Sequence, residues 1–224
     1  MHRSAYEHMK MAMARHLPKD RRLEVLELGS ARVANQPLDH RSLLAEVDHS
    51  YIGVDIREAD NVDVVMKKPY TIPARSNSKD VVIAGQVFEH IPFFWASMLE
   101  VARILRPGGV WFVTVPSRGH RHGGVDCWRY YRGGMRAIAA ASRLTLLETH
   151  THFPPTLDGS IRHDYAKTDS QMHYWGDTLG VFQKPQRYPL EMRVVAPVVR
   201  WWANRSAADG PLGGPPKFDP KCPL

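Results

Sequence analysis

The sequence predicts a doubly wound α/β fold, in which helices pack on the two faces of a mostly parallel β-sheet. Two apolar runs carry the prediction: residues 23–28 end at a glycine turn beginning with Gly29, and residues 51–54 end at Asp55. A third run, residues 79–84, leads into a helical pattern. Buried apolar strands that alternate with helices are typical of βαβ units and parallel sheets.

Residues 2–65 supply a leading helix and three strands. Residues 2–17 carry apolar side chains at helical spacing and predict a helix that Pro18 ends. After the first strand, Pro37 makes a long crossover helix improbable, although a short segment near 42–47 can complete the connection. Residues 62–65 predict the third strand.

The rest of the chain supplies the remaining elements. A helical pattern over 99–105 stops at the Pro-Gly-Gly that follows Arg106, and a buried strand over 110–115 is ended by Pro116. A helix over 134–141 comes next. The last two strands are expected at residues 144–149 and 178–183.

Ligands of doubly wound proteins bind at the carboxyl ends of the strands. Gly29 would let the backbone approach such a ligand, and the two oxygens of Asp55 could accept both hydroxyls of a ribose. Taken one at a time, the glycine could be an ordinary turn and the aspartate a solvated acid. The order of the motifs that follow favours a nucleoside site.

Four motifs stand in a recognisable order: E-L-G-S at 27–30, G-V-D at 53–55, D-V-V-I-A-G-Q-V-F-E-H-I at 80–91 and R-I-L-R-P-G-G at 103–109. Over residues 22–150 the chain resembles class I S-adenosylmethionine (SAM) dependent methyltransferases of the type 11 family. The resemblance implies a Rossmann-like, seven-stranded sheet with an antiparallel last strand, helices on both faces, and SAM as the cofactor.

The resemblance also implies a role for each cofactor-binding residue. Glu27 would receive the ammonium of SAM, and Gly29 with Ser30 would lie against its amino-acid part. Asp55 would hold the ribose, Ile56 would pack on the adenine, and Gln86 would lie beside the sulfonium.

The chain departs from its relatives after the third strand. In the family that the chain resembles, an acid commonly lies there and contacts the adenine amino group, but this chain has Lys67, which offers no acceptor. The leading helix at 2–17 either lies over the cofactor, as in many relatives, or covers the edge of the sheet.

The candidate catalytic residues are His90, His120, His122 and Asp126. His90 follows Gln86 by four residues, so both could face one way on a helix. It would either help to deprotonate the acceptor or hold the next loop in place. Half of the twelve histidines lie in 117–177, interleaved with aspartates and aromatics.

Three interpretations of the 117–177 segment remain open. It can form an acceptor pocket with a histidine as general base, a site for a divalent cation such as Mg²⁺, or a structural unit. For residues 128–130 we favour structure, and for His120, His122 and Asp126 we favour function. A D-x-W-R-Y segment at 126–130 resembles a bacterial subgroup that is similar to sugar O-methyltransferases.

These features lead us to expect O-methylation of a saccharide, an oligosaccharide included, or of a similar polyhydroxylated small molecule. A hydroxyl needs a base, which a histidine-rich pocket supplies. The net charge of +7 keeps an RNA methyltransferase as one alternative. However, the basic residues are dispersed and no Asn-Pro-Pro-Tyr motif follows the strand predicted at 79–84, so no nucleic-acid partner is expected. A non-catalytic SAM-binding protein is the other alternative.

We expect one domain over residues 1–204, with 117–177 as its substrate or lid region and 205–224 as a loosely ordered tail. The two cysteines form no disulfide framework, and no signal peptide or transmembrane run is apparent, which predicts a cytoplasmic protein. Residues 190–202 are apolar, with Pro197 limiting their regularity. They can serve a homodimer contact, a membrane-surface contact or a final packing helix.

Overall fold

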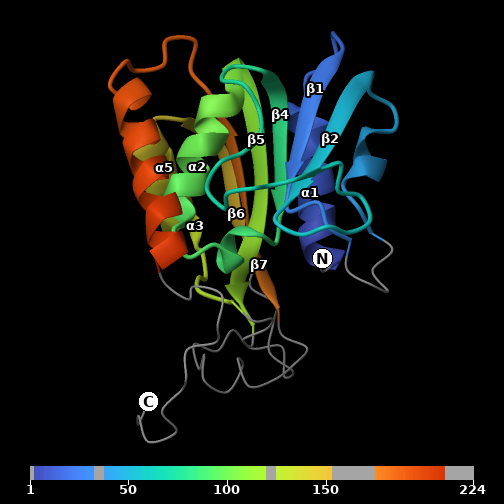
Figure 1. The fold of residues 1–224 in the computed structure, drawn as a ribbon. Helices are drawn as coiled ribbons and strands as arrows, with labels where there is room; N and C mark the ends of the chain where they lie inside the picture. The colour runs from blue at the N-terminus through green and yellow to red at the C-terminus, as the bar shows by residue number, and fades with distance from the viewer. Residues whose placement is uncertain (1–2, 33–37, 120–124, 153–174, 210–224) are drawn as a thin grey trace, which may run out of the picture.

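The computed structural model describes residues 3–32, 38–119, 125–152 and 175–209 and is built around one seven-stranded sheet (Figure 1). The order of its strands across the sheet is β3-β2-β1-β4-β5-β7-β6. In chain order the strands are β1 (Leu23–Leu28), β2 (His49–Asp55), β3 (Val64–Val65), β4 (Lys79–Gly85), β5 (Leu105–Arg118), β6 (Thr145–Thr151) and β7 (Gly176–Gln183).

Strand direction follows the prediction. Strand β1 pairs in parallel with β2 and β4, β2 pairs in parallel with β3, and β4 pairs in parallel with β5. Strand β7 is antiparallel to both of its neighbours, β5 and β6. The mostly parallel, seven-stranded sheet with an antiparallel last strand is therefore confirmed.

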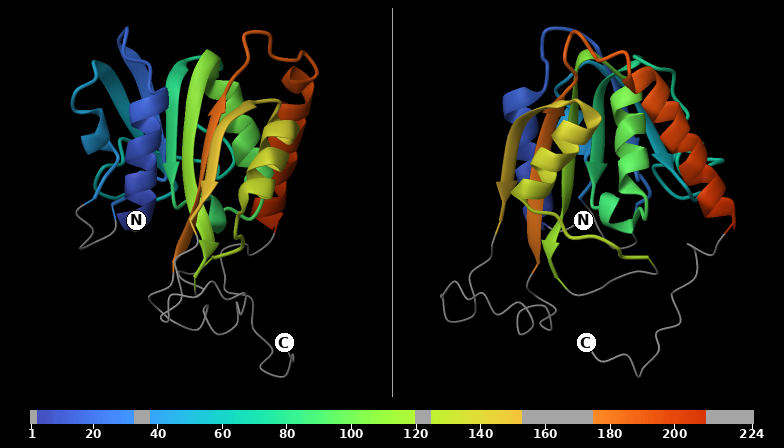
Figure 2. Two further views of the ribbon diagram at one scale, coloured as in Figure 1. Left: turned by 180° about the vertical axis from the view of Figure 1, so that it is seen from behind. Right: turned by 90° about the vertical axis from the view of Figure 1, so that its left-hand side faces the viewer.

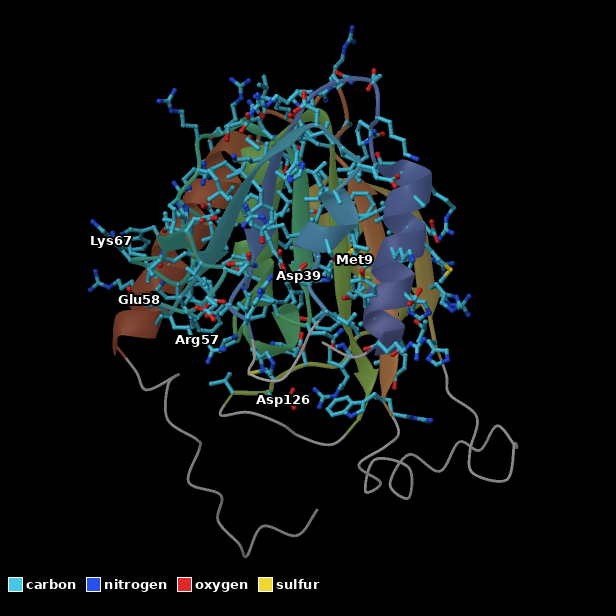
Figure 3. All side chains as sticks on the ribbon, turned by 90° about the vertical axis from the view of Figure 1, so that its right-hand side faces the viewer. Met9, Asp39, Arg57, Glu58, Lys67 and Asp126 are labelled. Carbon is cyan, nitrogen blue, oxygen red and sulfur yellow. The ribbon has the colours of Figure 1, made fainter. Side chains whose placement is uncertain are left out.

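Helices cover both faces of the sheet, as expected (Figure 2). On one face lies α1 (Arg3–His16), whose Met9 points toward the sheet (Figure 3). On the opposite face lie α2 (Phe94–Ile104), α3 (Arg132–Ser142) and α5 (Met192–Asp209). Helix α1 thus covers a face of the sheet, and none of its residues lines the cavity described below.

Alternate residues of the central strands fill two separate cores, because successive side chains of a strand point to opposite faces. Leu26 of β1 and Val82 of β4 belong to the core under α2, α3 and α5. Val25 and Ile83, their immediate neighbours, belong to the core under α1. This double burial explains why these strands read as continuous apolar runs.

Strand β5 differs from the prediction at both of its ends. Strand β5 continues through Pro116 to Arg118, with a register shift against β7 at this point. A bulge tolerates the missing N–H of proline, which explains the continuation. Strand β5 also begins earlier than predicted, at Leu105, with an irregularity where the Pro-Gly-Gly segment lies.

The C-terminal helix, α5, also differs from the expectation. Pro197 lies inside α5, which extends to Asp209 and so includes the first residues of the predicted tail. Buried contacts made by Met192, Ala196 and Ala203 hold the helix on the rest of the protein despite the proline. The rest of that tail, 210–224, lies outside the described residues.

The first crossover is short, in keeping with Pro37. Between β1 and β2, the described residues form only a 3₁₀ helix, η1 (Arg41–Leu44). A second 3₁₀ helix, η2 (Phe88–His90), follows β4. In the described part of the chain, none of the helices combines the length and apolarity that crossing a membrane requires.

Candidate functional site

A cavity of about 760 Å³ opens at the carboxyl ends of β1, β2 and β4. The strand order reverses between β1 and β4, and such switch points are where doubly wound proteins bind ligands. The structure brings together here every residue that was predicted to bind the cofactor, together with His90. The predicted residues that line the cavity are Glu27, Gly29, Ser30, Asp55, Ile56, Gln86 and His90.

Gly29 forms the turn that ends β1, with φ of +75°. A Cβ at this position would lie 2.1 Å from a Cγ of Val87, so no larger residue fits without movement. Its backbone N–H donates to the carbonyl of Val54 in β2, 2.8 Å away. Because Gly29 has no side chain, its backbone forms part of the cavity lining.

Asp55 ends β2 with its carboxylate held by two backbone amides. One oxygen accepts from the N–H of Ala31 and the other from the N–H of Arg57, each at 3.2 Å. Each carboxylate oxygen has a second lone pair, so the group can still accept hydrogen bonds from a ligand. Beside it, Ile56 is 67% exposed and presents an apolar surface at the cavity.

Gln86 follows β4 in the left-handed region, with φ of +57°, rather than on a helix with His90 as expected. Both polar atoms of its buried carboxamide lack a hydrogen-bond partner among the described residues, and the same holds for the hydroxyl of Ser30. Unpartnered buried polar groups are uncommon in proteins, so these atoms fit a site completed by a polar ligand.

Glu27 has partners that the sequence did not reveal. One carboxylate oxygen lies 2.9 Å from Nδ1 of His40, and the other accepts from the Tyr51 hydroxyl at 2.5 Å. Burial, together with the neighbouring Glu27, raises the pKa of Tyr51. Nε2 of the buried His40, which also lines the cavity, has no hydrogen-bond partner within the described structure. A ligand ammonium would therefore meet Glu27 and His40 together.

Sequence reasoning missed His40 and Tyr51 because both contacts depend on tertiary structure. His40 lies in the irregular crossover, and Tyr51 is paired across the sheet with Val25 rather than with Glu27. The neighbouring Gly85 is the one indirect signal, since a Cβ there would lie 2.2 Å from the His40 ring.

Lys67 lies away from the cofactor cavity, which explains how the chain tolerates a lysine at this point. Lys67 and Lys68 are exposed and line a separate groove beside α5, whereas the preceding Met66 is buried and lines the cavity. Met66 is held in place by its N–H, which donates to the carbonyl of Asp55 at 2.7 Å. At this position the thioether side chain of Met66 lines the cavity.

His90 ends η2 and is oriented by the loop that follows β5. Its Nδ1 lies 2.5 Å from the carbonyl oxygen of Val125, which can only accept, so Nδ1 carries the proton and donates. In this tautomer Nε2 is the acceptor nitrogen of the ring. Oε1 of the buried Glu89 lies 3.7 Å from Nε2.

Glu89 is fully buried, and neither of its oxygens has a hydrogen-bond partner in the described residues. Burial raises its pKa to about 8, with the nearby Asp126 adding to the shift and Arg129 opposing it. At neutral pH this carboxyl group is therefore largely protonated.

The segment from Asp126 to Tyr130 is tied to η2. Asp126 and Arg129 form a bidentate ion pair, Trp128 donates from Nε1 to the carbonyl of Ile91 at 3.1 Å, and the Tyr130 hydroxyl donates to the carbonyl of Phe88. The structural interpretation of residues 128–130 is thereby confirmed. The Asp126 carboxylate is buried in its ion pair with Arg129.

His120 and His122 lie outside the described residues, as do residues 153–174 of the predicted lid region. Within the ranges that the structure does describe, no three His, Cys, Asp or Glu side chains gather as a metal site. Asp126 and Arg57 lie near the same end of the sheet as the cavity (Figure 3).

Comparison with known proteins agrees with this geometry. A family model described as "Methyltransferase domain" matches residues 26–113, which include Glu27, Asp55 and Gln86. A probable SAM-dependent methyltransferase of Mycolicibacterium smegmatis is 29% identical over 178 residues. That alignment covers 75% of this chain, but the chain spans only 61% of the relative.

Solved methyltransferase structures share the fold. One is a putative methyltransferase from Bacillus halodurans, with a TM-score of 0.57, 12% identity and coverage of 81% of this chain and 99% of that one. Another is the 1,6-didemethyltoxoflavin N1-methyltransferase of Burkholderia thailandensis, solved with bound S-adenosylhomocysteine. It gives a TM-score of 0.56 at 13% identity over 81% of this chain and 79% of that one.

The matched domain and the relative show that this chain is similar to SAM-dependent methyltransferases, and the solved structures show that it shares their fold. This similarity supports SAM as the cofactor. The cavity fits this cofactor: Asp55 offers acceptors for ribose hydroxyls, and Ser30, His40 and Gln86 add polar atoms that have no hydrogen-bond partner among the described residues. Its volume lies within the ~300–1,000 Å³ usual for small-molecule sites.

The raised pKa of Glu89 predicts a pH-dependent stability. The folded state keeps this proton up to about pH 8, whereas the unfolded chain releases it near the ordinary value of 4.5, so stability falls as pH rises between these values. Glu89→Gln, which resembles the protonated form, removes this loss. Urea unfolding at pH 5.5 and pH 7.5 should show the variant gaining on wild type by up to about 1.4 kcal/mol per pH unit. An equal pH dependence in both proteins would contradict the shift.

Proposed function

We propose that the protein transfers the methyl group of SAM to a hydroxyl of a saccharide or a similar polyhydroxylated small molecule. The observation that carries the proposal is the placement of His90 at the cofactor cavity, with Nδ1 donating to the carbonyl of Val125. This bond orients the ring and makes Nε2 its proton-accepting nitrogen. A base is what an oxygen acceptor requires, because a hydroxyl is a poor nucleophile near neutral pH.

Each step of the proposed reaction has a group that can perform it. Bound SAM supplies an electrophilic methyl group; the acceptor oxygen forms the new C–O bond as the C–S bond breaks. His90 takes the hydroxyl proton on Nε2, and Asp55 and Gly29 would hold the cofactor beside the acceptor. Orientation of this kind removes much of the entropic barrier.

The protonation state of Glu89 suits this role of His90. Because its pKa is raised to about 8, Glu89 is largely uncharged at neutral pH and places no anion beside the His90 ring. We assign Glu89 as a positioning residue. Asp126 is assigned the same role, since its ion pair with Arg129 holds the loop that carries Val125.

The saccharide part of the proposal rests on the 117–177 segment. Histidines and aspartates can bind sugar hydroxyls, and aromatic rings can stack on sugar faces. His120 and His122 follow β5 in the sequence, and they remain candidate acceptor-binding or base residues.

The proposal is tested by transfer of a labelled methyl group from SAM to a panel of mono- and oligosaccharides, polyols, amines and RNA. Each acceptor is assayed with and without Mg²⁺. We expect turnover on a hydroxyl acceptor. Methylation confined to an amine or to RNA would overturn the acceptor class, and SAM binding without turnover on any acceptor would favour a non-catalytic SAM-binding protein.

A further inference from the structure

Helix α5 is apolar on two opposite sides, and the described part of the protein covers only one of them. Met192, Ala196 and Ala203 are buried against the body of the protein. The other side carries a continuous exposed stripe that also includes Leu190, just before the helix. The exposed residues of this stripe are Leu190 at 68%, Val194 at 67%, Val195 at 42%, Val198 at 57%, Trp201 at 62% and Trp202 at 44%. Apolar patches of this kind mark interaction surfaces.

Basic residues flank the stripe. The groove beside α5 is lined by Lys67 and Lys68 from the segment after β3, and by Trp201 and Arg205 from the helix. Figure 3 shows Lys67 projecting outward beside α5. The guanidinium carbon of Arg205 lies 5.8 Å from the centre of the Trp201 ring. From residue 192 to residue 208 the helix contains no Asp or Glu.

From this combination we infer that the outer face of α5, together with Lys67 and Lys68, docks on an anionic lipid surface. A helix with exposed tryptophans and aliphatic side chains, bordered by Lys and Arg, matches the chemistry of helices that lie in the membrane interface. Basic residues beside an apolar stripe are attracted to anionic headgroups, and the net charge of +7 adds to that attraction.

The charge of the face argues against a second copy of this chain as its occupant, although a homodimer through this segment is the alternative that the sequence left open. A two-fold contact brings the same surface of both copies together. The basic residues of one copy would then meet those of the other, and the helix offers no acid between residues 192 and 208, with Glu191 and Asp209 only at its two ends. RNA is disfavoured because the lysines of this face could bind phosphate, but the exposed leucine and valines beside them would find no apolar partner.

The docking face adjoins the cofactor cavity. Pro69 and Ala207 line both the basic groove and the cavity, so docking through α5 would bring the cavity mouth close to the lipid surface. Docking on a lipid surface is independent of the proposed function. If the proposed function also holds, this placement of the cavity suits an acceptor that is carried on a lipid.

The test measures co-flotation of the full chain with vesicles, without SAM or acceptor, so its failure would leave the proposed function standing. We expect binding to phosphatidylcholine vesicles that contain phosphatidylglycerol, and much weaker binding to pure phosphatidylcholine or at high salt. The double variants Val194→Glu/Val198→Glu and Lys67→Ala/Lys68→Ala should each weaken binding by about tenfold or more.

Met11→Glu is the matched control, because Met11 is 47% exposed on α1, on the opposite face of the sheet. It should bind vesicles as wild type does. The inference is overturned if anionic vesicles are not bound, or if the α5 variants bind as well as the control. If vesicle binding is absent, either of two results would overturn the inference by identifying another occupant. One is a dimer that Val194→Glu/Val198→Glu dissociates, and the other is RNA binding that Lys67→Ala/Lys68→Ala abolishes.

Discussion

His90→Gln is expected to lower the rate of methyl transfer to a hydroxyl acceptor by about 10²–10⁴-fold, the usual contribution of a positioned general base. Glutamine can still donate to the carbonyl of Val125, as Nδ1 of His90 does at 2.5 Å, but it cannot take a proton. SAM affinity should change little, because the predicted cofactor contacts come from other residues. The loss should therefore appear in kcat rather than in cofactor binding.

His49→Gln is the matched control for this substitution. Nδ1 of His49 also lies close to a backbone carbonyl, that of Val47 at 2.7 Å, but His49 begins β2, at the end of the strand away from the cavity. It should retain wild-type turnover. Full activity in His90→Gln would remove His90 as the base and would leave His120 and His122 as the candidates.

Glu100→Ala is expected to destabilise the fold by about 3–5 kcal/mol, the range found when one partner of a buried ion pair is removed. The Glu100 side chain is 1% exposed and lies in α2, facing α5. One oxygen accepts from Arg103 at 2.8 Å and from Arg200 of α5 at 2.6 Å. The other accepts from Arg103 and from the N–H of Ile72. Alanine would leave all three donors without this acceptor.

Urea unfolding monitored by circular dichroism measures the effect. Glu191→Ala is the control, because this glutamate is exposed just before α5 and its loss should change stability by no more than about 0.5 kcal/mol. Glu100→Gln keeps the shape of the side chain but removes its negative charge. Its loss of stability should fall between those of Glu100→Ala and Glu191→Ala. A loss below about 1 kcal/mol in Glu100→Ala would show that the network does not hold α5 on α2.

The site could be predicted to a large extent because its residues stand at strand ends. Gly29, Asp55 and Gln86 each follow a buried apolar run, and parallel strands bring such residues to one edge of the sheet. The contacts of His40 and Tyr51 with Glu27 could not be predicted, since they depend on the path of an irregular crossover. No local pattern encodes such a path.

The errors in the fold have a related cause. Local rules gave Pro116 as the end of a strand and Pro197 as a limit on the regularity of the last helical segment, but tertiary contacts overrode both. Pairing with β7 carries β5 past Pro116, and packing against the body of the protein carries α5 past Pro197. Where a neighbour supplies the stabilisation, the loss of one backbone hydrogen bond does not end the element.

The central claim is that the cavity between β1, β2 and β4 binds SAM through Asp55, and calorimetric titration tests it most directly. Wild type should bind one equivalent of SAM with a Kd on the order of micromolar. Asp55→Ala should bind at least about 100-fold more weakly, because two hydrogen bonds to a charged acceptor are lost. Asp60→Ala, an exposed acid that does not line the cavity, should bind as wild type does. Absence of binding by wild type, or equal affinity in Asp55→Ala, would contradict the account.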